Sequence, residues 1–226
     1  MRGWLGLDIS SYQYPVDWAR VKQSGRKFVI IKAGEAQEED PRVDEHITGA
    51  AAEDFHIGLY WFSWPHDDAG RVRAEANRCC DVADRYRNRG IKWMPLFLDL
   101  EGGREEIQTA TFVQACARMW CDTCEQRGYK AGVYYNYDYQ TRYYPPEFWA
   151  AHPSYYRWFA FYDSGPTSQT FNIWQYSAVG QVPGIAGNVD LDKISDGTPD
   201  PPGQRLPVWL LCWLKKKKFP KMRGEK

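Results

Sequence analysis

Short apolar runs alternate with segments of helical spacing through the first two-thirds of the chain. The runs have strand length, whereas the segments between them repeat apolar positions every three or four residues. The expected strands are Trp4–Ile9, Lys27–Ala33, Ile57–Phe62, Met94–Leu100 and Tyr129–Tyr135. The expected helices are Asp17–Ser24, Arg42–Phe55, Asp67–Arg89 and Glu105–Arg127. Such alternation predicts parallel strands joined by crossover helices, and Gly25, Gly90 and Gly128 mark helix ends.

After Asn136 the pattern changes. Three further strands are expected at Tyr156–Tyr162, Phe171–Tyr176 and Ile185–Leu191, with short links rich in Pro, Gly and Ser. Only Pro146–Ala151 has the pattern of a helical turn. The sequence therefore predicts an α/β fold, a TIM-like barrel with five βα units followed by three strands lacking full outer helices. A barrel of this kind carries its site at the C-terminal ends of the strands.

Two regions are expected, a catalytic barrel over residues 1–196 and a linker and tail over 197–226. The linker reads GTPDPPGQRLP, a composition typical of turns. In the tail, the nine apolar residues Leu206–Leu214 precede Lys215–Lys218. Nine residues are too few to span a bilayer, which takes about 20 as a helix. A weak contact of this tail with anionic membrane or wall polymer, a tail packed back on the domain, and a tail without a role all remain open.

Charge is unevenly spread over the 226 residues, although the formal net charge is zero. The last twelve residues carry seven Lys or Arg and one Glu, so the tail is +6 and the remainder −6. An acidic body argues against a nucleic-acid partner, because phosphate binding needs a basic face. The N-terminus shows no apolar run of signal-peptide length. We therefore expect a protein made in the cytoplasm that either leaves by another route or acts after its producer lyses. We also expect a monomer.

Cysteines and aromatic residues each allow more than one interpretation. The six cysteines are Cys79, Cys80, Cys116, Cys121, Cys124 and Cys212. The single CxxC lies in a helical pattern without a second pair, which favours reduced thiols over a disulfide or a zinc site. Aromatic residues make up 16% of the chain, enough for a large core or for a groove that stacks on sugar rings.

The segment MPLFLDLEGG carries the strongest chemical signal. Side chains alternate along a strand, so its three leucines share one face, which suits contact with covering helices. Phe97, Asp99 and Glu101 share the other face, which then points into the barrel. Two adjacent inward acids are costly as structure alone, because desolvation and like charge both oppose ionisation. Their carboxyl groups are expected roughly 5–8 Å apart from strand spacing.

Two other strands place an acid on the same face. In GWLGLDIS this residue is Asp8, and in GIAGNVDLD it is Asp190, so three strands are expected to end in an inward acid. Clustered carboxylates without histidines suit glycoside cleavage, in which one protonated acid serves the leaving oxygen. Magnesium or calcium is the competing use of such a cluster. No EF-hand or phosphate-binding loop accompanies it, and we expect neither metal nor cofactor.

From Gly6 to Ile194 the sequence resembles glycoside hydrolase family 25, the lysozyme-like muramidases of phages, bacteria and fungi. The segments that carry the resemblance are Gly6–Ser10, Phe28–Ala33 with Glu35, Tyr60–Phe62, Asp99–Glu101, Trp174–Tyr176, Val182–Ile185 and Val189–Leu191. One departure is Trp61, where the family usually has His. The last three segments form one closing motif, so five motifs stand in order at plausible spacing and make the resemblance specific.

The resemblance implies cleavage of the β-1,4 bond between N-acetylmuramic acid and N-acetylglucosamine in peptidoglycan, as in a phage endolysin. Glu101 would be the general acid, and Asp99 would orient a substrate acetamido group acting as nucleophile. Asp8 and Asp190 would shape the charge of the site. Residues implied in substrate binding are Tyr60, Phe62, Tyr134, Trp174 and Glu35. Two alternatives stay open, a non-catalytic barrel that binds wall glycan and a glycosidase acting on another N-acetylated glycan.

Overall fold

Eight strands close into a barrel in the computed structural model, which describes residues 3–65, 68–101, 109–162 and 170–195. The strands are β1 (Leu5–Ile9), β2 (Phe28–Glu35), β4 (His56–Phe62), β5 (Lys92–Asp99), β6 (Ala131–Asn136), β7 (Tyr156–Ala160), β8 (Ile173–Gly180) and β9 (Val189–Ile194). Their order around the sheet is β1-β9-β8-β7-β6-β5-β4-β2, and pairing of β1 with β2 closes the ring. A two-residue strand, β3 (Glu38–Glu39), adds to the edge of β2.

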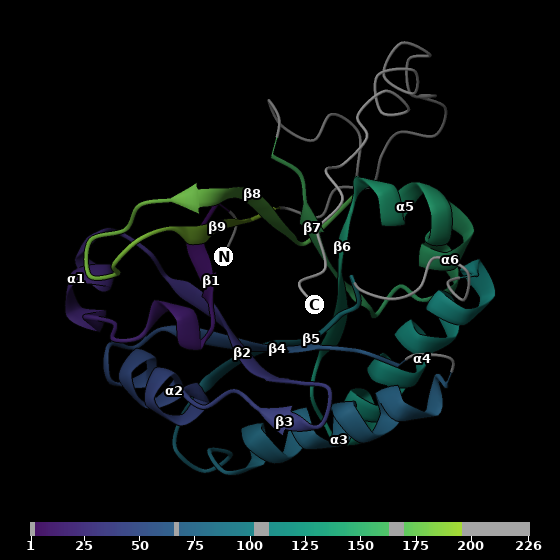
Figure 1. The fold of residues 1–226 in the computed structure, drawn as a ribbon, viewed down its shortest axis with the longest axis horizontal. Helices are drawn as coiled ribbons and strands as arrows, with labels where there is room; N and C mark the ends of the chain where they lie inside the picture. Colours follow the sequence, from purple (N-terminus) through teal and green to yellow (C-terminus); the bar gives the residue numbers. More distant parts are fainter. Residues whose placement is uncertain (1–2, 66–67, 102–108, 163–169, 196–226) are drawn as a thin grey trace, which may run out of the picture.

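Five βα units precede three strands that have no comparable helices in the described residues, as predicted (Figure 1). The helices are α1 (Trp18–Gln23), α2 (Val43–Ala52), α3 (Gly70–Asp84), α4 (Ala110–Gln126), α5 (Tyr137–Tyr143) and α6 (Pro146–Ala151), with a 3₁₀ turn at Ser11–Gln13. The fold is thus the expected TIM-like α/β barrel. Among the described residues, no helix is both long enough and apolar enough to cross a bilayer.

Helix α5 was not expected from the sequence, which indicated only α6 in this region. Its segment is rich in tyrosine, and aromatic residues have modest helix propensity. The Asn136 side chain starts the helix by accepting the Tyr139 amide at 3.0 Å. Tyr139 and Tyr143, four residues apart, then bury one face. Local capping and tertiary burial therefore outweigh the weak propensity.

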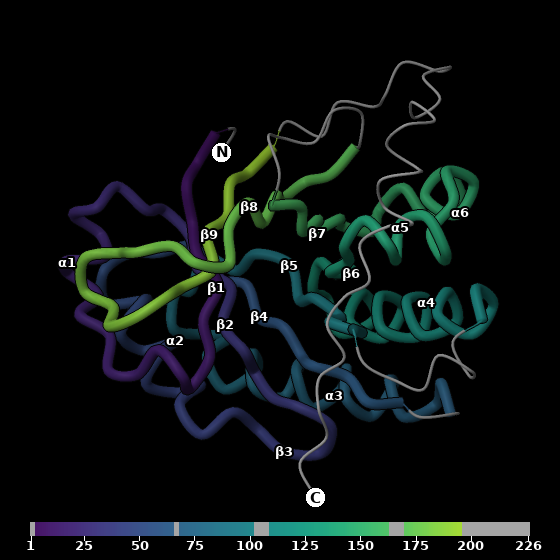
Figure 2. Tube along the Cα trace, turned by 45° about the horizontal axis from the view of Figure 1, so that its top comes forward, coloured from purple at the N-terminus to yellow at the C-terminus, as the bar shows by residue number. Residues whose placement is uncertain are grey.

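The last strand was placed too early by the sequence pattern. It was expected at Ile185–Leu191, but β9 begins at Val189 and runs antiparallel to both β8 and β1. The link from β8 is too short for a crossover helix, so the chain turns back as a hairpin. Figure 2 shows β9 beside β1 at this closure. Asp190 therefore lies at the start of its strand rather than its end, and the reversal brings it to the same end of the barrel as Asp8.

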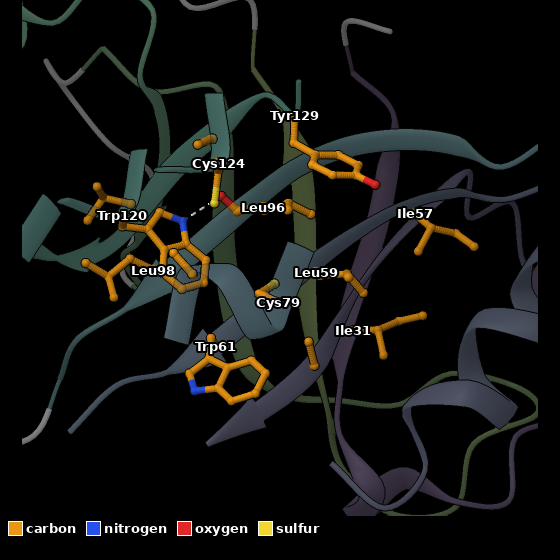
Figure 3. Packing of buried hydrophobic residues seen from close by; sticks show 14 of the residues in the cluster. Ile31, Ile57, Leu59, Trp61, Cys79, Leu96, Leu98, Trp120, Cys124 and Tyr129 are labelled. Carbon is orange, nitrogen blue, oxygen red and sulfur yellow. Dashed lines mark hydrogen bonds between the residues drawn. The ribbon is translucent and has the colours of Figure 1, made fainter. Parts of the chain in front are cut away.

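The outward faces of the strands and the inner faces of the helices form the larger core. Leu96, Leu98 and Leu100 are buried there, as the alternation of β5 predicted. Trp120 of α4 donates its indole N–H to the Leu96 carbonyl at 3.1 Å (Figure 3). The described cysteines are all free thiols in this layer, and Cys212 lies outside the described residues. The layer fixes the strands whose other face carries the acids.

A second cluster of buried hydrophobic side chains fills the barrel interior. Trp158 is at its centre, with ring centroids 4.7 Å from Tyr134, 5.3 Å from Phe97 and 5.8 Å from Tyr60. These residues close the barrel beneath its C-terminal end, so the interior is packed and not a channel. The acids lie above or beside this aromatic floor.

Candidate active site

Asp99 ends β5 and Glu101 follows two residues later, at the C-terminal mouth of the barrel. Asp99 is level with Phe62 of β4 and Tyr134 of β6 in the parallel register, and its side chain is 8% exposed. The carboxyl groups of Asp99 and Glu101 are close enough to hydrogen-bond, nearer than strand spacing predicted. Glu101 lies beyond the last residue of β5, so the pleat of the strand does not hold the two groups apart.

The environment of Asp99 opposes its ionisation. Burial raises the pKa of its carboxyl group well above the usual range, and the neighbouring Glu101 raises it further. The ammonium of Lys32, on the inward face of β2, acts in the opposite direction. Among the described residues, Asp99 Oδ1 has no hydrogen-bond partner although it is buried. A buried acceptor without a donor is costly, so this oxygen is suited to an N–H supplied by a ligand.

Glu101 is partly open to solvent as a residue, while its carboxyl group is packed among its neighbours. This desolvation raises the pKa of Glu101 above its ordinary value. A hydrogen bond with the Tyr134 hydroxyl and one with Asp99 lower it, and the charge of Asp190 raises it. Glu101 is therefore an accessible carboxylic acid that keeps its proton to higher pH than a free glutamic acid, as a general acid must.

Asp8 and Asp190 meet where β1 and β9 pair, directly opposite one another in the antiparallel register. Gln175 of β8 donates its amide to Asp8 Oδ2 at 2.8 Å and accepts the Tyr134 hydroxyl at 2.9 Å. Burial raises the pKa of Asp8 well above its usual range, and nearby carboxylates add to that effect. Burial also raises the pKa of Asp190. The structure thus brings all four sequence-predicted acids to one end of the barrel.

The mouth near β2 carries a second polar cluster. Lys32 Nζ lies 2.6 Å from Glu35 Oε2 and 5.4 Å from the Phe62 ring centroid. Trp64 donates its indole N–H to Glu35 Oε1 at 3.0 Å, and its ring contacts Phe62 edge-on. Glu35 is about half exposed, with a pKa lowered by its bonds to Lys32 and Trp64 against the raising effect of burial. Glu35 is therefore a charged rim residue held by two partners.

The two remaining aromatic candidates lie on different faces of the barrel wall. Tyr60 points into the interior cluster, where burial raises the pKa of its hydroxyl and the charges of Asp8 and Asp99 add to this. Trp174 is on the opposite face of β8 from Gln175, packs against the helix-side core and donates its N–H to the Phe161 carbonyl at 2.8 Å. It does not join the carboxylates, because adjacent strand residues point to opposite faces.

The described residues contain no group of three or more His, Cys, Asp or Glu arranged to hold a metal ion. The model of glycosyl hydrolases family 25 matches residues 7–185, most of the barrel. The chain belongs to this family. It is 27% identical to Lysozyme M1 of Streptomyces globisporus over 215 residues, covering 85% of this chain and 68% of that protein.

Solved structures agree with the family 25 fold. A bacterial lysozyme from Streptomyces coelicolor superposes with a TM-score of 0.71 at 24% identity, covering 87% of this chain and 94% of that one. The catalytic domain of an endolysin from a bacteriophage of Listeria monocytogenes gives 0.65 at 28% identity, with 86% and 94% covered. Both cover nearly the whole of the described barrel.

Sequence reasoning missed several interior residues of this family 25 barrel. Gln175, Trp158 and Asp192 face the acids, and Tyr162, just after β7, donates its hydroxyl to Gln175 at 2.6 Å. Asp192 had a detectable signal, because it shares the even-numbered face of β9 with Asp190. Gln175 and Trp158 had none, since an amide or an indole within a strand is compatible with either face.

Trp61, which replaces the usual histidine, points away from the carboxylates. It is fully buried in the helix-side core near Cys79 (Figure 3), and its indole N–H donates to the Ala36 carbonyl at 3.1 Å. Gly34 makes room for it, since a Cβ at that position would lie 2.4 Å from the indole ring. The substitution therefore changes packing behind the site, while Tyr60 and Phe62 keep their inward positions.

Proposed function

We propose that this family 25 hydrolase is a muramidase that cleaves the β-1,4 bond between N-acetylmuramic acid and N-acetylglucosamine in peptidoglycan. The observation that carries the proposal is the Asp99 and Glu101 pair, two touching carboxyl groups with raised pKa at the mouth of the barrel. Lysozyme M1, and an N,O-diacetylmuramidase from Arthroderma benhamiae that is 34% identical over 98 residues, support this substrate class.

Glu101 acts as the general acid in this proposal. Its protonated carboxyl group donates to the glycosidic oxygen as the bond to the anomeric carbon breaks, and the resulting carboxylate later takes a proton from water. Tyr134 holds the carboxyl group by hydrogen bonding, and desolvation raises the pKa of Glu101, which favours the protonated form. The accessible position of Glu101 fits contact with a long polymer.

Asp99 orients the acetamido group of the sugar bound before the scissile bond. Its buried Oδ1, which lacks a partner among the described residues, accepts the acetamido N–H. This contact directs the acetamido carbonyl oxygen at the anomeric carbon, where it displaces the leaving group and carries positive charge that Asp99 stabilises. Lys32 acts toward the ionised form of Asp99 that this role needs, against the larger effects of burial and of Glu101, which together raise the pKa of Asp99.

The substrate-binding residues in this proposal are those that reach the mouth. Tyr60 and Tyr134 face the barrel interior beside the acids, and Phe62 and Glu35 border the site at the end of β4 and β2. Asp8 and Asp190 set the charge below the sugar. The proposed site of action is the bacterial wall, in the manner of the phage endolysin domain to which the chain is similar.

Glu101→Gln provides the direct test, because it keeps the shape and removes the transferable proton. We expect a rate loss of about 100-fold or more on purified peptidoglycan, with an unchanged thermal unfolding transition. In the native enzyme the rate should fall at alkaline pH as Glu101 ionises, at a pH above that of an ordinary glutamic acid. A variant with near-native rate, or a native rate flat up to pH 9, would remove Glu101 from this role.

Product analysis separates the muramidase from its alternatives. Mass spectrometry of wall digests should show muramic acid at the new reducing ends. Glucosamine ends, or products from chitin but none from wall, would indicate a glycosidase of other specificity. Binding to wall without any products would indicate a glycan-binding barrel.

A further inference from the structure

A fifth acid, Asp192, lies deeper in the barrel than the four described above. It is two residues beyond Asp190 on the same face of β9, and its side chain is completely buried. Its register partner on β1 is Gly6, two residues from Asp8, and the Phe28 ring fills the space that a side chain at Gly6 would take. A charged carboxylate at this depth would be expensive without full compensation.

Only one of the two carboxyl oxygens of Asp192 receives a hydrogen bond from a donor group among the described residues. Trp158 donates its indole N–H to Asp192 Oδ1 at 2.8 Å. Oδ2 is buried and receives no hydrogen from any donor group in the described part of the chain. The group that it does meet is the carboxyl of Asp8, within hydrogen-bonding reach. Two carboxyl oxygens in this contact repel each other unless a proton lies between them.

We propose that Asp8 and Asp192 share one proton, and that Asp192 is a positioning residue that holds Asp8 in the active site through this hydrogen bond. Both groups have the properties of such a pair. Burial raises the pKa of Asp192 to about 7 and that of Asp8 well above its usual range. With one proton between them the pair carries a single negative charge in a site that has few cations.

The pair is connected to the general acid by hydrogen bonds. Asp8 accepts the amide of Gln175, whose carbonyl oxygen accepts the hydroxyls of Tyr134 and Tyr162. Tyr134 is also a hydrogen-bond partner of Glu101. The orientation of Asp8 therefore fixes the Gln175 amide, and through it the tyrosine that holds Glu101. The kinetic consequence of the proposal rests on the proposed muramidase function.

Several titratable groups face this pair from the surrounding strands. They are Asp190 on β9, Tyr60 on β4, Tyr134 on β6 and Tyr162 after β7. The other charged groups of the site are Asp99, Glu101 and Lys32, and Tyr176 on β8 is affected by the charge of Asp192 although its ring packs beside Trp174. Asp190 also hydrogen-bonds with Asp8, so it could affect the titration of Asp8 independently of Asp192. The test must therefore change Asp192 and read out Asp8.

Carbon-13 NMR of the full chain labelled at aspartate carboxyl groups gives that readout, with Asp8→Asn to assign the Asp8 signal. In Asp192→Asn the new amide donates to Asp8 and removes the competing charge. We expect Asp8 to ionise at a pH lower by at least about one unit than in the native protein. Asp40→Asn is the control. Asp40 is a buried acid that accepts hydrogen bonds from the Ser11 and Arg42 backbone amides, and its replacement should leave the Asp8 titration unchanged.

Kinetics on peptidoglycan test the positioning role. Asp192→Asn should keep kcat within about threefold, because its amide replaces the shared hydrogen bond. Asp192→Ala should lose at least about tenfold in kcat with little change in KM, in line with the loss of a hydrogen bond to a charged group. Thermal unfolding of each variant shows whether it is folded, and if Asp192→Ala does not fold, the comparison of Asp192→Asn with the native enzyme remains.

An unchanged Asp8 titration in Asp192→Asn would overturn the shared proton. A loss of kcat in Asp192→Asn beyond about tenfold, in a folded protein, would overturn positioning by a donated hydrogen bond. An inactive native enzyme with a shifted Asp8 titration would instead count against the muramidase function and leave the shared proton supported.

Discussion

At the scale of a single residue, Glu75 links the scaffold to Asp99, one of the carboxylates of the proposed site. It lies on α3 with a side chain 5% exposed, and it accepts the hydroxyl of the buried Ser63. The Ser63 amide in turn donates to the Asp99 carbonyl at 2.8 Å. Burial raises the pKa of Glu75 to about 7, partly offset by its hydrogen bonds. This acid therefore titrates in the core, behind the strand that carries Asp99.

The raised pKa of Glu75 predicts a stability change with a definite sign. The folded protein binds the proton more tightly than the unfolded chain, so the Glu75 contribution is present below the ordinary pKa and is lost as pH rises through about 7. Glu75→Gln removes this term. Relative to the native protein, the variant should gain about 2 kcal/mol in free energy of unfolding between pH 5 and pH 8.

Urea unfolding of both proteins at the two pH values measures this difference. Comparing native and variant at each pH cancels the other buried acids, whose pKa values are raised in the same direction. A difference that does not change with pH would mean that Glu75 already ionises freely in the folded state.

The alternation of side chains along a strand predicted the face on which individual residues lie. Asp8, Asp99 and Asp190 were recognised because each acid interrupts an apolar strand on a fixed face. The family resemblance implied that Trp174 binds substrate, yet in the structure Gln175 faces the carboxylates and Trp174 lies on the opposite face of β8. The face follows from position, whereas residue type alone does not determine it.

At the scale of elements, β6 depends on close contact with its neighbours. Gly132 lies on the inward face, and a Cβ there would be 2.4 Å from the Tyr156 carbonyl oxygen and 2.8 Å from the Phe97 ring. A backbone oxygen cannot rotate away, so the strands would have to separate. Gly132→Ala should therefore lower the free energy of unfolding by about 1–3 kcal/mol, as overpacked cores do.

Gly58→Ala in β4 is the matched comparison for Gly132→Ala. Its nearest neighbour, the Pro95 carbonyl oxygen, would be 3.1 Å from the new Cβ, so the loss should be smaller. Urea unfolding of the two variants shows which one loses more free energy of unfolding. Equal losses would show that the β6 contact relaxes at no greater cost than the β4 contact.

The helices differ in how far local signals predicted them. Asp17 and Thr109 cap α1 and α4 with side-chain hydrogen bonds, and those helices appeared in the expected places. The expected first residues of the fourth helix, 105–108, lie outside the described residues. Helix α3 ends at Asp84, before the expected Arg89. Asp84 there accepts Arg87, Arg127 and Tyr129, so contacts from a distant segment hold the turn that follows α3.

At the scale of the whole molecule, the basic tail lies outside the described residues, and its role remains a prediction. The apolar segment 206–214 followed by four lysines suits contact with an anionic surface. If the tail binds the enzyme to such a surface, deletion of residues 204–226 should lower lysis of whole cells and leave cleavage of soluble glycan unchanged. The difference should shrink as salt rises, because screening weakens such attraction.

Parallel assays of the full and shortened chains on both substrates measure the effect of the tail. Unfolding of the shortened chain should match that of the full chain, since the barrel closes through β9 before the deleted segment. Equal activity of the two chains on whole cells would leave the tail without a role in targeting.

The sequence by itself determined the order of the strands and of every helix except α5, the face on which each predicted acid lies and the family to which the chain belongs. These depend on the two-residue and 3.6-residue periods and on short motifs, which are local properties. Tertiary structure decided the direction of β9, the contact of Asp99 with Glu101 and the burial of Asp192 beneath Asp8. The direction of β9 and the burial of Asp192 arise from barrel closure, which pairs the first strand with the last and brings together groups that are far apart along the chain. The contact of Asp99 with Glu101 is local, and it depends on where β5 ends.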